Sequence, residues 1–192
     1  MKTLLTTGMV AALLVGGVAS ASAQMEQLDR PFRVNVGLLM PSDGDVKDFV
    51  GNSHFKLGLS YDMWGGMFSG RAYRGGVFFD LSTKERGGNS FNTSAIGAFG
   101  RFNFGEGGMQ GWTPYAGAGL GMFFIDADQD APPPSGARTS LSVFQGGSRL
   151  GGKLFVGLEA SQGYFAELGY QWTGSKDGAN ASGLSVSLGF RF

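Results

Sequence analysis

The stretch Leu184-Ser185-Val186-Ser187-Leu188-Gly189-Phe190-Arg191-Phe192 decides the fold. Apolar side chains occupy every second position of this stretch, and serine, glycine and arginine lie between them. Because successive side chains of a strand point to opposite faces, the pattern predicts a strand with one apolar face and one polar face. The alternation also runs for longer than the roughly five or six residues of an average strand.

Seven more runs alternate in the same way, and segments rich in Gly, Asp and Ser separate them. They are Phe32–Leu38, Phe55–Met63, Tyr73–Ser82, Ile96–Phe104, Tyr115–Phe124, Arg149–Glu159 and Tyr164–Trp172. The sequence therefore predicts eight strands, an even number, as in single-chain outer-membrane barrels. A soluble β-sandwich also alternates, but runs of about ten residues match the length that a tilted strand needs to cross a bilayer.

Aromatic residues gather near the ends of these runs, where membrane barrels carry their aromatic girdles. One predicted girdle contains Phe32, Trp64, Tyr73, Phe104, Trp112, Tyr164, Phe190 and Phe192, and the other contains Phe55, Phe124, Phe144, Tyr170 and Trp172. We therefore expect an all-β fold, an eight-stranded antiparallel up-and-down transmembrane β-barrel.

The N-terminal segment is typical of a secretory signal peptide. Lys2 supplies the positive charge, Leu4–Val18 is an uncharged apolar run, and Ala21-Ser22-Ala23 matches the small-x-small cleavage pattern. We expect residues 1–23 to be removed and residues 24–192 to form the barrel domain in the bacterial outer membrane. No later segment is long and apolar enough for a spanning helix, so a mature membrane protein would have to span as a closed barrel.

The connections between the runs differ in length. With both termini in the periplasm, the longer and more polar connections face outwards, as in other membrane barrels. The predicted outer loops are Pro41–His54, Thr83–Asn92, Asp126–Val143 and Thr173–Ser182, and the predicted inner turns are Gly65–Gly70, Gly105–Gly111 and Ala160–Gly163.

Composition excludes several classes of protein. The chain has no cysteine, so it has no disulfide, no thiolate metal site and no cysteine nucleophile. Its formal net charge is zero, whereas a nucleic-acid-binding protein needs a basic surface. We therefore expect no nucleic-acid partner. The 35 glycines accompany 17 phenylalanines, which indicates ordered structure because disordered glycine-rich chains are poor in aromatic residues.

Three stretches carry a resemblance to a known group: residues 113–121, residues 163–170 and the terminal strand ending in Phe192. With them the chain resembles the small eight-stranded outer-membrane barrels of the OmpA, OmpX and OmpW types, over about Arg30 to Phe192. The resemblance implies that the barrel-assembly machinery recognises the terminal strand through Leu188, Phe190 and Phe192. It is a likeness of fold, and fold does not fix function.

The polar faces of the strands carry eleven ionisable residues that we expect inside the barrel. They are Arg33, Lys56, Asp62, Arg74, Asp80, Arg101, Arg149, Lys153, Glu159, Glu167 and Arg191. An eight-stranded barrel is just wide enough for its side chains to fill it, and buried charges must pair. The main interpretation is an ion-pair network that plugs the lumen, with Glu167 and Arg191 as a direct pair and Arg33 as a second base. The alternative is a narrow path that favours anions, because seven of the eleven residues are basic.

Two motifs suggest chemistry that their surroundings do not support. Gly117-x-Gly119-x-Gly121 lies inside a predicted strand with no helix after it, so it is not a dinucleotide loop; we expect these glycines to make room for lumen side chains such as Phe99 and Phe155. The residues Asp126, Asp128 and Asp130 begin like a calcium loop, but Ala131 and Ala137 replace the required Gly and Glu. We therefore predict neither a metal nor a cofactor, with a loose divalent-ion site on lipopolysaccharide as the minor alternative.

Function remains open between three classes. The leading hypothesis is a non-enzymatic barrel with a structural or surface-interaction role, in contact with outer-membrane lipids and lipopolysaccharide. The second is a small channel for hydrophobic or small anionic solutes, with a side opening at Gly75-Gly76 or Gly151-Gly152. The third, a lipid-modifying enzyme, would depend on His54, the single histidine, for which no Ser and acid partners can be identified in the sequence. Sequence leaves the oligomeric state undetermined.

Overall fold

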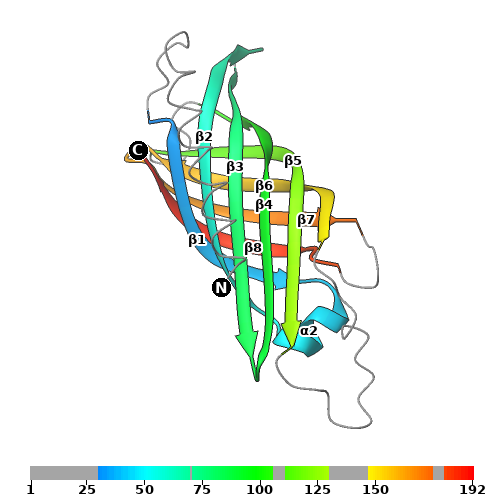
Figure 1. Cartoon of the computed structure of the whole chain (residues 1–192). Coiled ribbons are helices and arrows are strands. Elements are labelled where there is room, and N and C mark those ends of the chain that lie inside the picture. Colours follow the sequence, from blue (N-terminus) through cyan, green and yellow to red (C-terminus); the bar gives the residue numbers. More distant parts are fainter. Residues whose placement is uncertain (1–29, 70, 106–110, 130–146, 175–179) are drawn as a thin grey trace.

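The computed structural model is a closed barrel of eight antiparallel strands, and it describes residues 30–69, 71–105, 111–129, 147–174 and 180–192 (Figure 1). Each strand pairs with its neighbours in the sequence, and the last strand closes the barrel against the first. The strands are β1 (Phe32–Pro41), β2 (His54–Phe68), β3 (Arg71–Arg86), β4 (Asn89–Asn103), β5 (Trp112–Gln129), β6 (Gly147–Ala160), β7 (Tyr164–Thr173) and β8 (Gly183–Arg191). The predicted fold class is confirmed.

The two ends of the barrel differ, and we name them by what they carry. The terminal end holds Arg30 and Phe192, together with the β2–β3, β4–β5 and β6–β7 connections. The loop end holds a short helix, α2 (Gly44–Val50), and the tip of the β3–β4 hairpin (Figure 1). Residues 1–29, including the predicted signal peptide, lie outside the described residues.

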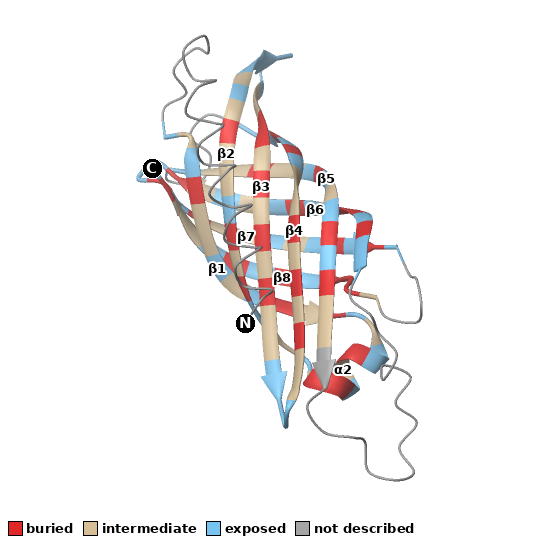
Figure 2. Ribbon diagram, viewed as in Figure 1, coloured by how far each residue is buried: buried red, intermediate tan, exposed pale blue. Residues whose placement is uncertain are grey.

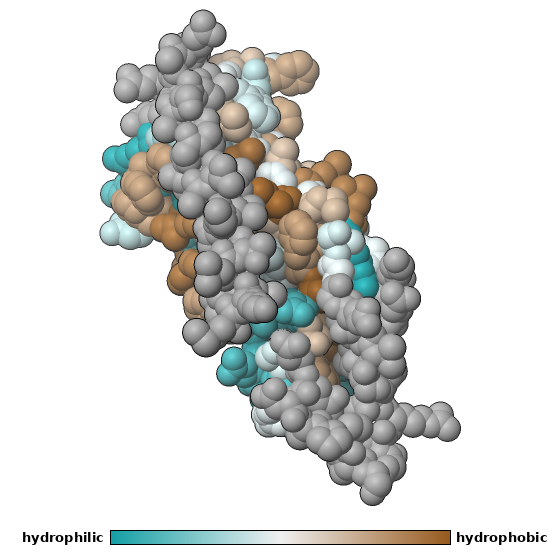
Figure 3. All heavy atoms as spheres, viewed as in Figure 1, coloured by the Kyte–Doolittle hydropathy of each residue, from teal (hydrophilic) through white to brown (hydrophobic). Residues whose placement is uncertain are grey.

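Burial inverts the pattern of a soluble protein, in which charged residues are almost never fully buried. Arg101 and Asp62 on the inner face are 0% and 1% exposed, whereas Leu120 and Leu188 on the outer face are 64% and 65% exposed. Buried and exposed residues alternate along the strands in Figure 2, and apolar atoms cover much of the described outer surface facing the viewer in Figure 3. The inward and outward faces are those that the alternation predicts.

Several strands run further than predicted. The expected outer loop Thr83–Asn92 is wrong, because β3 continues to Arg86 and β4 begins at Asn89. Only Gly87 and Gly88 remain as the turn, with φ of 58° and 83°. Positive φ at both central residues matches the twist of a tight hairpin, and Gly-Gly adopts it without steric cost. The expected loop that starts at Asp126 and the expected turn Gly65–Gly70 shorten likewise, since β5 reaches Gln129 and β2 reaches Phe68.

The predicted loop Pro41–His54 contains α2, which the sequence analysis missed. The Asp43 side chain caps this helix by accepting a 2.9 Å hydrogen bond from the backbone N–H of Asp45. Val46, Phe49 and Val50 are buried on one side, and their spacing is that of one helical face. Among the described residues, no helix is long and apolar enough to cross a membrane.

Candidate functional site

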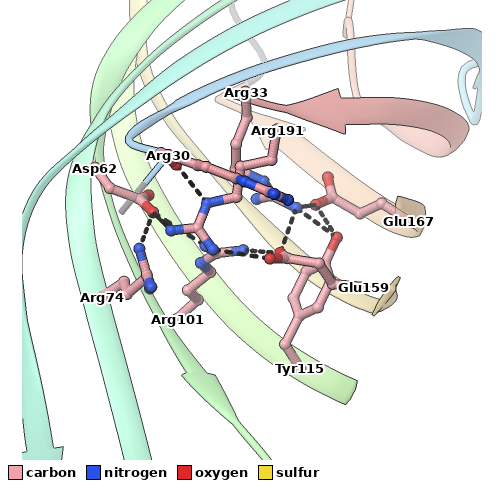
Figure 4. A network of polar contacts seen from close by, with 9 residues as sticks. All are labelled: Arg30, Arg33, Asp62, Arg74, Arg101, Tyr115, Glu159, Glu167 and Arg191. Atoms are coloured by element: carbon pink, nitrogen blue, oxygen red, sulfur yellow. Dashed lines mark hydrogen bonds and ion pairs between the residues drawn. The ribbon is translucent and has the colours of Figure 1, made fainter. Parts of the chain in front are cut away.

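Seven of the predicted lumen residues, joined by Tyr115, form one network near the terminal end, which we call the terminal cluster (Figure 4). Its members are Arg33, Asp62, Arg74, Arg101, Tyr115, Glu159, Glu167 and Arg191. Arg101 is the centre, because its Nη1 lies 2.9 Å from Glu159 Oε2 and its Nη2 lies 3.0 Å from Asp62 Oδ2. Arg101 and Asp62 side chains are 0% exposed, so each compensates a charge that would otherwise be costly to bury.

Glu159 and Asp62 each serve several arginines. Arg191 Nη1 approaches Glu159 Oε1 at 2.9 Å, and its Nη2 lies 3.6 Å from Asp62 Oδ2. Arg74 Nη1 reaches the same Asp62 oxygen at 3.4 Å. Because one carboxylate is shared by guanidinium groups from different strands, the cluster ties together strands that are not neighbours in the sheet.

Tyr115 extends the network to Glu167. Arg33 Nη2 donates to the Tyr115 hydroxyl at 2.8 Å, and that hydroxyl donates to Glu167 Oε2 at 3.0 Å. Arg33 also lies 3.9 Å from Glu167 Oε2 and covers the ring of Phe165, with its guanidinium carbon 3.9 Å from the ring centre. The sequence analysis gave Tyr115 no role, although alternation along its strand puts it on the same face as Gly117 and Gly119, toward the lumen charges.

The predicted direct pair between Glu167 and Arg191 is wrong, because each residue forms its ion pairs with other partners. The described ion pairs of Arg191 are with Glu159 and Asp62, and that of Glu167 is with Arg33. The physical reason is the register of β7 and β8, which sets Ser187 opposite Glu167. Arg191 lies four residues further along, about 13 Å at the rise of a strand, so it meets β6 rather than its neighbour on β7.

A second group, the central cluster, lies further from the terminal end and contains Lys56, Asp80 and Lys153. Lys153 Nζ approaches Asp80 Oδ2 at 2.9 Å, and Lys56 Nζ lies 3.7 Å from the same oxygen. Lys153 Nζ also lies 3.8 Å from the centre of the Phe78 ring, within the range of a cation–π contact. Lys56 donates to Ser185 Oγ at 3.4 Å, a polar contact that the sequence analysis did not single out.

Aromatic side chains fill the lumen around and between these two clusters. The buried set is Phe78, Phe99, Tyr115, Phe123, Phe155 and Phe165, with Ala95. Residues of both clusters, among them Arg33 and Lys153, line a cavity of only about 10 Å³. That volume is about what a single water needs.

The terminal end is more open than the space between the clusters. A pocket of about 310 Å³ lies there, with Arg30, Asn103, Thr113, Glu159 and Arg191 among its lining residues. Water entering this pocket reaches the edge of the terminal cluster, since Glu159 and Arg191 belong to both.

Arg149 is the eleventh predicted lumen residue, and it lies apart from both clusters toward the loop end. It is 9% exposed, and its Nη1 donates to the Gly174 carbonyl at 3.0 Å. The structure thus places ten of the predicted charges in two clusters and the remaining one nearer the loop end.

The three residues of the predicted assembly signal lie on β8 and at the C-terminus. Leu188 and Phe192 are 65% and 57% exposed on the outer face. The Phe190 and Phe192 rings stack with centres 6.4 Å apart, and Phe32 lies 5.8 Å from Phe192. Aromatic residues of the predicted terminal girdle are therefore in contact across the β1–β8 closure; Phe144 of the other girdle lies outside the described residues.

The glycine pairs expected to give a side opening do not give one. The Trp64 indole covers Gly75, and the Trp172 indole covers Gly152, so that a methyl group on either glycine would overlap the ring. Gly76 pairs with Asp62 next to a bulge, where the register shifts between Asp62 and Trp64, and Gly151 pairs with Thr173 at the end of the β6–β7 ladder. These glycines therefore lie in closely packed parts of the barrel wall.

The row Gly117-x-Gly119-x-Gly121 lies within β5, as predicted. A β-carbon at Gly117 would overlap Phe155, and one at Gly119 would lie 3.1 Å from Phe78. The expectation that these glycines make room for lumen aromatics is confirmed for Phe155, whereas Phe78 takes the place expected for Phe99.

Among the described residues, the remaining candidates for catalysis or metal binding form no reactive group. His54 is 0% exposed at the start of β2. Asp126 lies within β5, while Asp130 falls outside the described residues. Within the described ranges, no group of three or more His, Cys, Asp or Glu side chains could hold a metal ion.

Comparison with known proteins adds structures but no sequence relatives. No protein-family model matches the chain, and no curated protein matches it. The structure of Neisserial surface protein A is 14% identical with a TM-score of 0.53, covering 84% of this chain and 96% of its own. The outer membrane enzyme PagL is 16% identical with a TM-score of 0.57, covering 83% of this chain and 98% of its own.

A third similar structure is the N-terminal β-barrel domain of Pseudomonas aeruginosa OprF, with 14% identity and a TM-score of 0.49 over 86% of this chain and all of that domain. At identities this low the likeness is one of fold. The chain has the fold of the small eight-stranded outer-membrane barrels, and this confirms the resemblance that the sequence predicted.

Proposed function

We propose that this barrel is an integral outer-membrane protein with a structural or surface-interaction role and a plugged lumen. The observation that supports it best is the pair of ion clusters with a one-water cavity between them. A continuous pore would need a chain of waters past Arg33 and Lys153, and the aromatic rings occupy that space.

The orientation follows from the same proposal. The terminal end faces the periplasm and the loop end faces outwards, with outer-membrane lipids and lipopolysaccharide around the exposed apolar face. Export depends on the signal peptide in residues 1–23, and the barrel-assembly machinery recognises Leu188, Phe190 and Phe192. No cofactor is needed for this role.

Conductance in planar bilayers tests the plug. We expect negligible current from the wild type. Lys153→Met together with Asp80→Asn removes the closest ion pair of the central cluster and should raise the conductance. A steady current through the wild-type protein would contradict the plugged lumen.

One observation favours a second candidate, a small channel for anions. Seven of the eleven predicted lumen charges are basic, so any ion path would be lined mainly by cationic groups. Reversal potentials in a salt gradient would reveal anion preference if current is found. A route for hydrophobic solutes would need a side opening in the barrel wall. The Trp64 and Trp172 indoles cover Gly75 and Gly152, where that opening was expected.

We also propose that the protein is not an enzyme. One similar structure is described as an enzyme, so the third class needs its own test. In this structure the single histidine is fully buried, and neither of its ring nitrogens hydrogen-bonds to a serine or an acid within the described residues. Mass spectrometry of lipid A from cells with and without the protein should give identical spectra, and a new deacylated species would overturn the proposal.

A further inference from the structure

The helix α2 packs against the loop end of the barrel through an apolar contact. Its Val46 and Val50 are 0% exposed and its Phe49 is 8% exposed. These side chains form one buried cluster with Phe91, Ile125 and Ala181, which come from β4, from β5 and from the residues before β8. The helix therefore bridges three parts of the barrel rim.

Two hydrogen bonds hold the ends of this helix to other segments. The Asn89 side-chain amide donates to the Phe49 carbonyl at 3.3 Å, and the backbone N–H of Asn180 donates to Asp43 Oδ2 at 3.2 Å. The net contribution of one such hydrogen bond to stability is only about 1 kcal/mol. The buried apolar cluster is therefore the main attachment of α2.

His54 lies beside this cluster without a satisfied ring nitrogen. It is 0% exposed, and its ring meets the edge of Phe91 with centres 5.6 Å apart. The backbone of Gly51 faces the ring, but neither nitrogen makes a hydrogen bond of normal geometry within the described residues. Such a buried site favours the neutral imidazole over the protonated imidazolium, because burial penalises charge.

The charged groups around His54 are cationic. Lys84 of β3 acts on it electrostatically, and Lys56 is the next inward residue on the same strand. Arg86 lies beside Gly51 at the end of α2. The neighbouring Phe91 of β4 is apolar, Ile125 of β5 belongs to the same apolar cluster, and the acidic Asp45 and Asp48 of α2 are exposed, away from the buried side. Lys84, the charged group that acts on the ring, is itself cationic and therefore opposes an imidazolium here.

We propose that α2 is a pH-sensitive lid, released from the barrel when His54 takes up a proton. With α2 closed, the neutral ring is favoured. With α2 open, water reaches the ring, which then titrates like an ordinary histidine, near pH 6.5. Closure is therefore most stable above that pH and weakens as the pH falls below it.

Thiol labelling of the folded protein in detergent micelles tests the lid, because the wild-type chain has no cysteine. Val46→Cys places a thiol in the buried cluster. Gly44→Cys is the matched control on the same helix, since Gly44 is exposed and has no atom within 4 Å of an added β-carbon. The ratio of their labelling rates removes the intrinsic pH dependence of thiol reactivity.

We expect this ratio to rise about tenfold between about pH 7.5 and about pH 5.5, since one unit below the ordinary histidine pKa corresponds to that factor. In the background of His54→Phe the ratio should stay constant. If that variant does not fold, His54→Gln serves the same purpose, because glutamine does not titrate. A ratio that is unchanged in the wild-type background, or that rises equally without His54, would overturn the proposal.

Discussion

A single carboxylate, Glu159, shows how individual residues stabilise the lumen. It accepts close contacts from Arg101 and Arg191 on opposite oxygens, both at 2.9 Å. Removing one partner of a buried pair leaves an uncompensated charge, whereas replacing both is often nearly neutral. The effect of each substitution should therefore depend strongly on the other residue.

This dependence gives a prediction in two matched double-mutant cycles. The cycle of Glu159→Gln with Arg191→Met should show a coupling energy of about 1–3 kcal/mol in urea unfolding, the range for residues in direct contact. The cycle of Glu167→Gln with Arg191→Met should show a smaller coupling, because Glu167 pairs with Arg33 instead. Equal coupling in the two cycles would contradict the partner assignment.

Glycines beside lumen aromatics give a second prediction at this scale. Gly117→Ala should destabilise the barrel by about 1–3 kcal/mol, the usual cost of overpacking, because the added methyl would overlap Phe155. Gly100→Ala on the neighbouring strand is the control, since an added β-carbon there meets nothing within 4 Å. Comparable losses of unfolding free energy for both variants would show that backbone conformation, rather than packing, requires glycine.

At the residue scale the sequence predicted which side chains face inwards but not which ones meet. Alternation with period two is a local property, so Arg101 and Glu159 could be assigned to the lumen without a structure. Their contact depends on the register of several strand pairs together, and a shift of one residue in any pair would change every partner. The sequence contains no simple signal for the combined register of several strand pairs.

Whole strands should respond to charge according to depth. Leu154 and Leu150 lie four residues apart on the outer face of β6 and are 55% and 72% exposed. Leu154→Arg, near the middle of the strand, should cost about 2–4 kcal/mol of unfolding free energy in liposomes. Leu150→Arg, closer to the loop end, should cost about 0–1 kcal/mol. Equal urea midpoints would mean that β6 does not cross the bilayer at this depth.

Among the elements, the helix α2 and the β3–β4 hairpin were the ones that the sequence analysis misjudged. The seven residues of α2 fall below the length at which helical periodicity is convincing, although Asp43 and the spacing of Val46, Phe49 and Val50 were visible. In the hairpin, Lys84-Glu85-Arg86 looks like a loop because it is charged. Strands that rise above a membrane can carry charge on both faces, and composition then no longer separates strand from loop.

The whole molecule should behave as a membrane barrel. Unboiled protein should migrate differently from boiled protein on a denaturing gel, because a closed sheet with every backbone group paired resists detergent. Fractionation should recover the protein with the outer membrane. Recovery from the soluble periplasm without detergent would contradict both the location and the proposed role.

The two-residue turn at Gly87-Gly88 has a consequence for how the barrel folds. It joins two strands whose pairing is local, from Arg86↔Asn89 to Tyr73↔Phe102, whereas the closing seam joins residues as distant as Arg33 and Arg191. Loop-closure entropy favours forming near contacts first. The hairpin is therefore expected to form early and the β1–β8 seam last. Strain introduced by Gly88→Ala, at φ of 83°, should slow folding into liposomes, while weakening the seam at Val36→Ala should mainly speed unfolding.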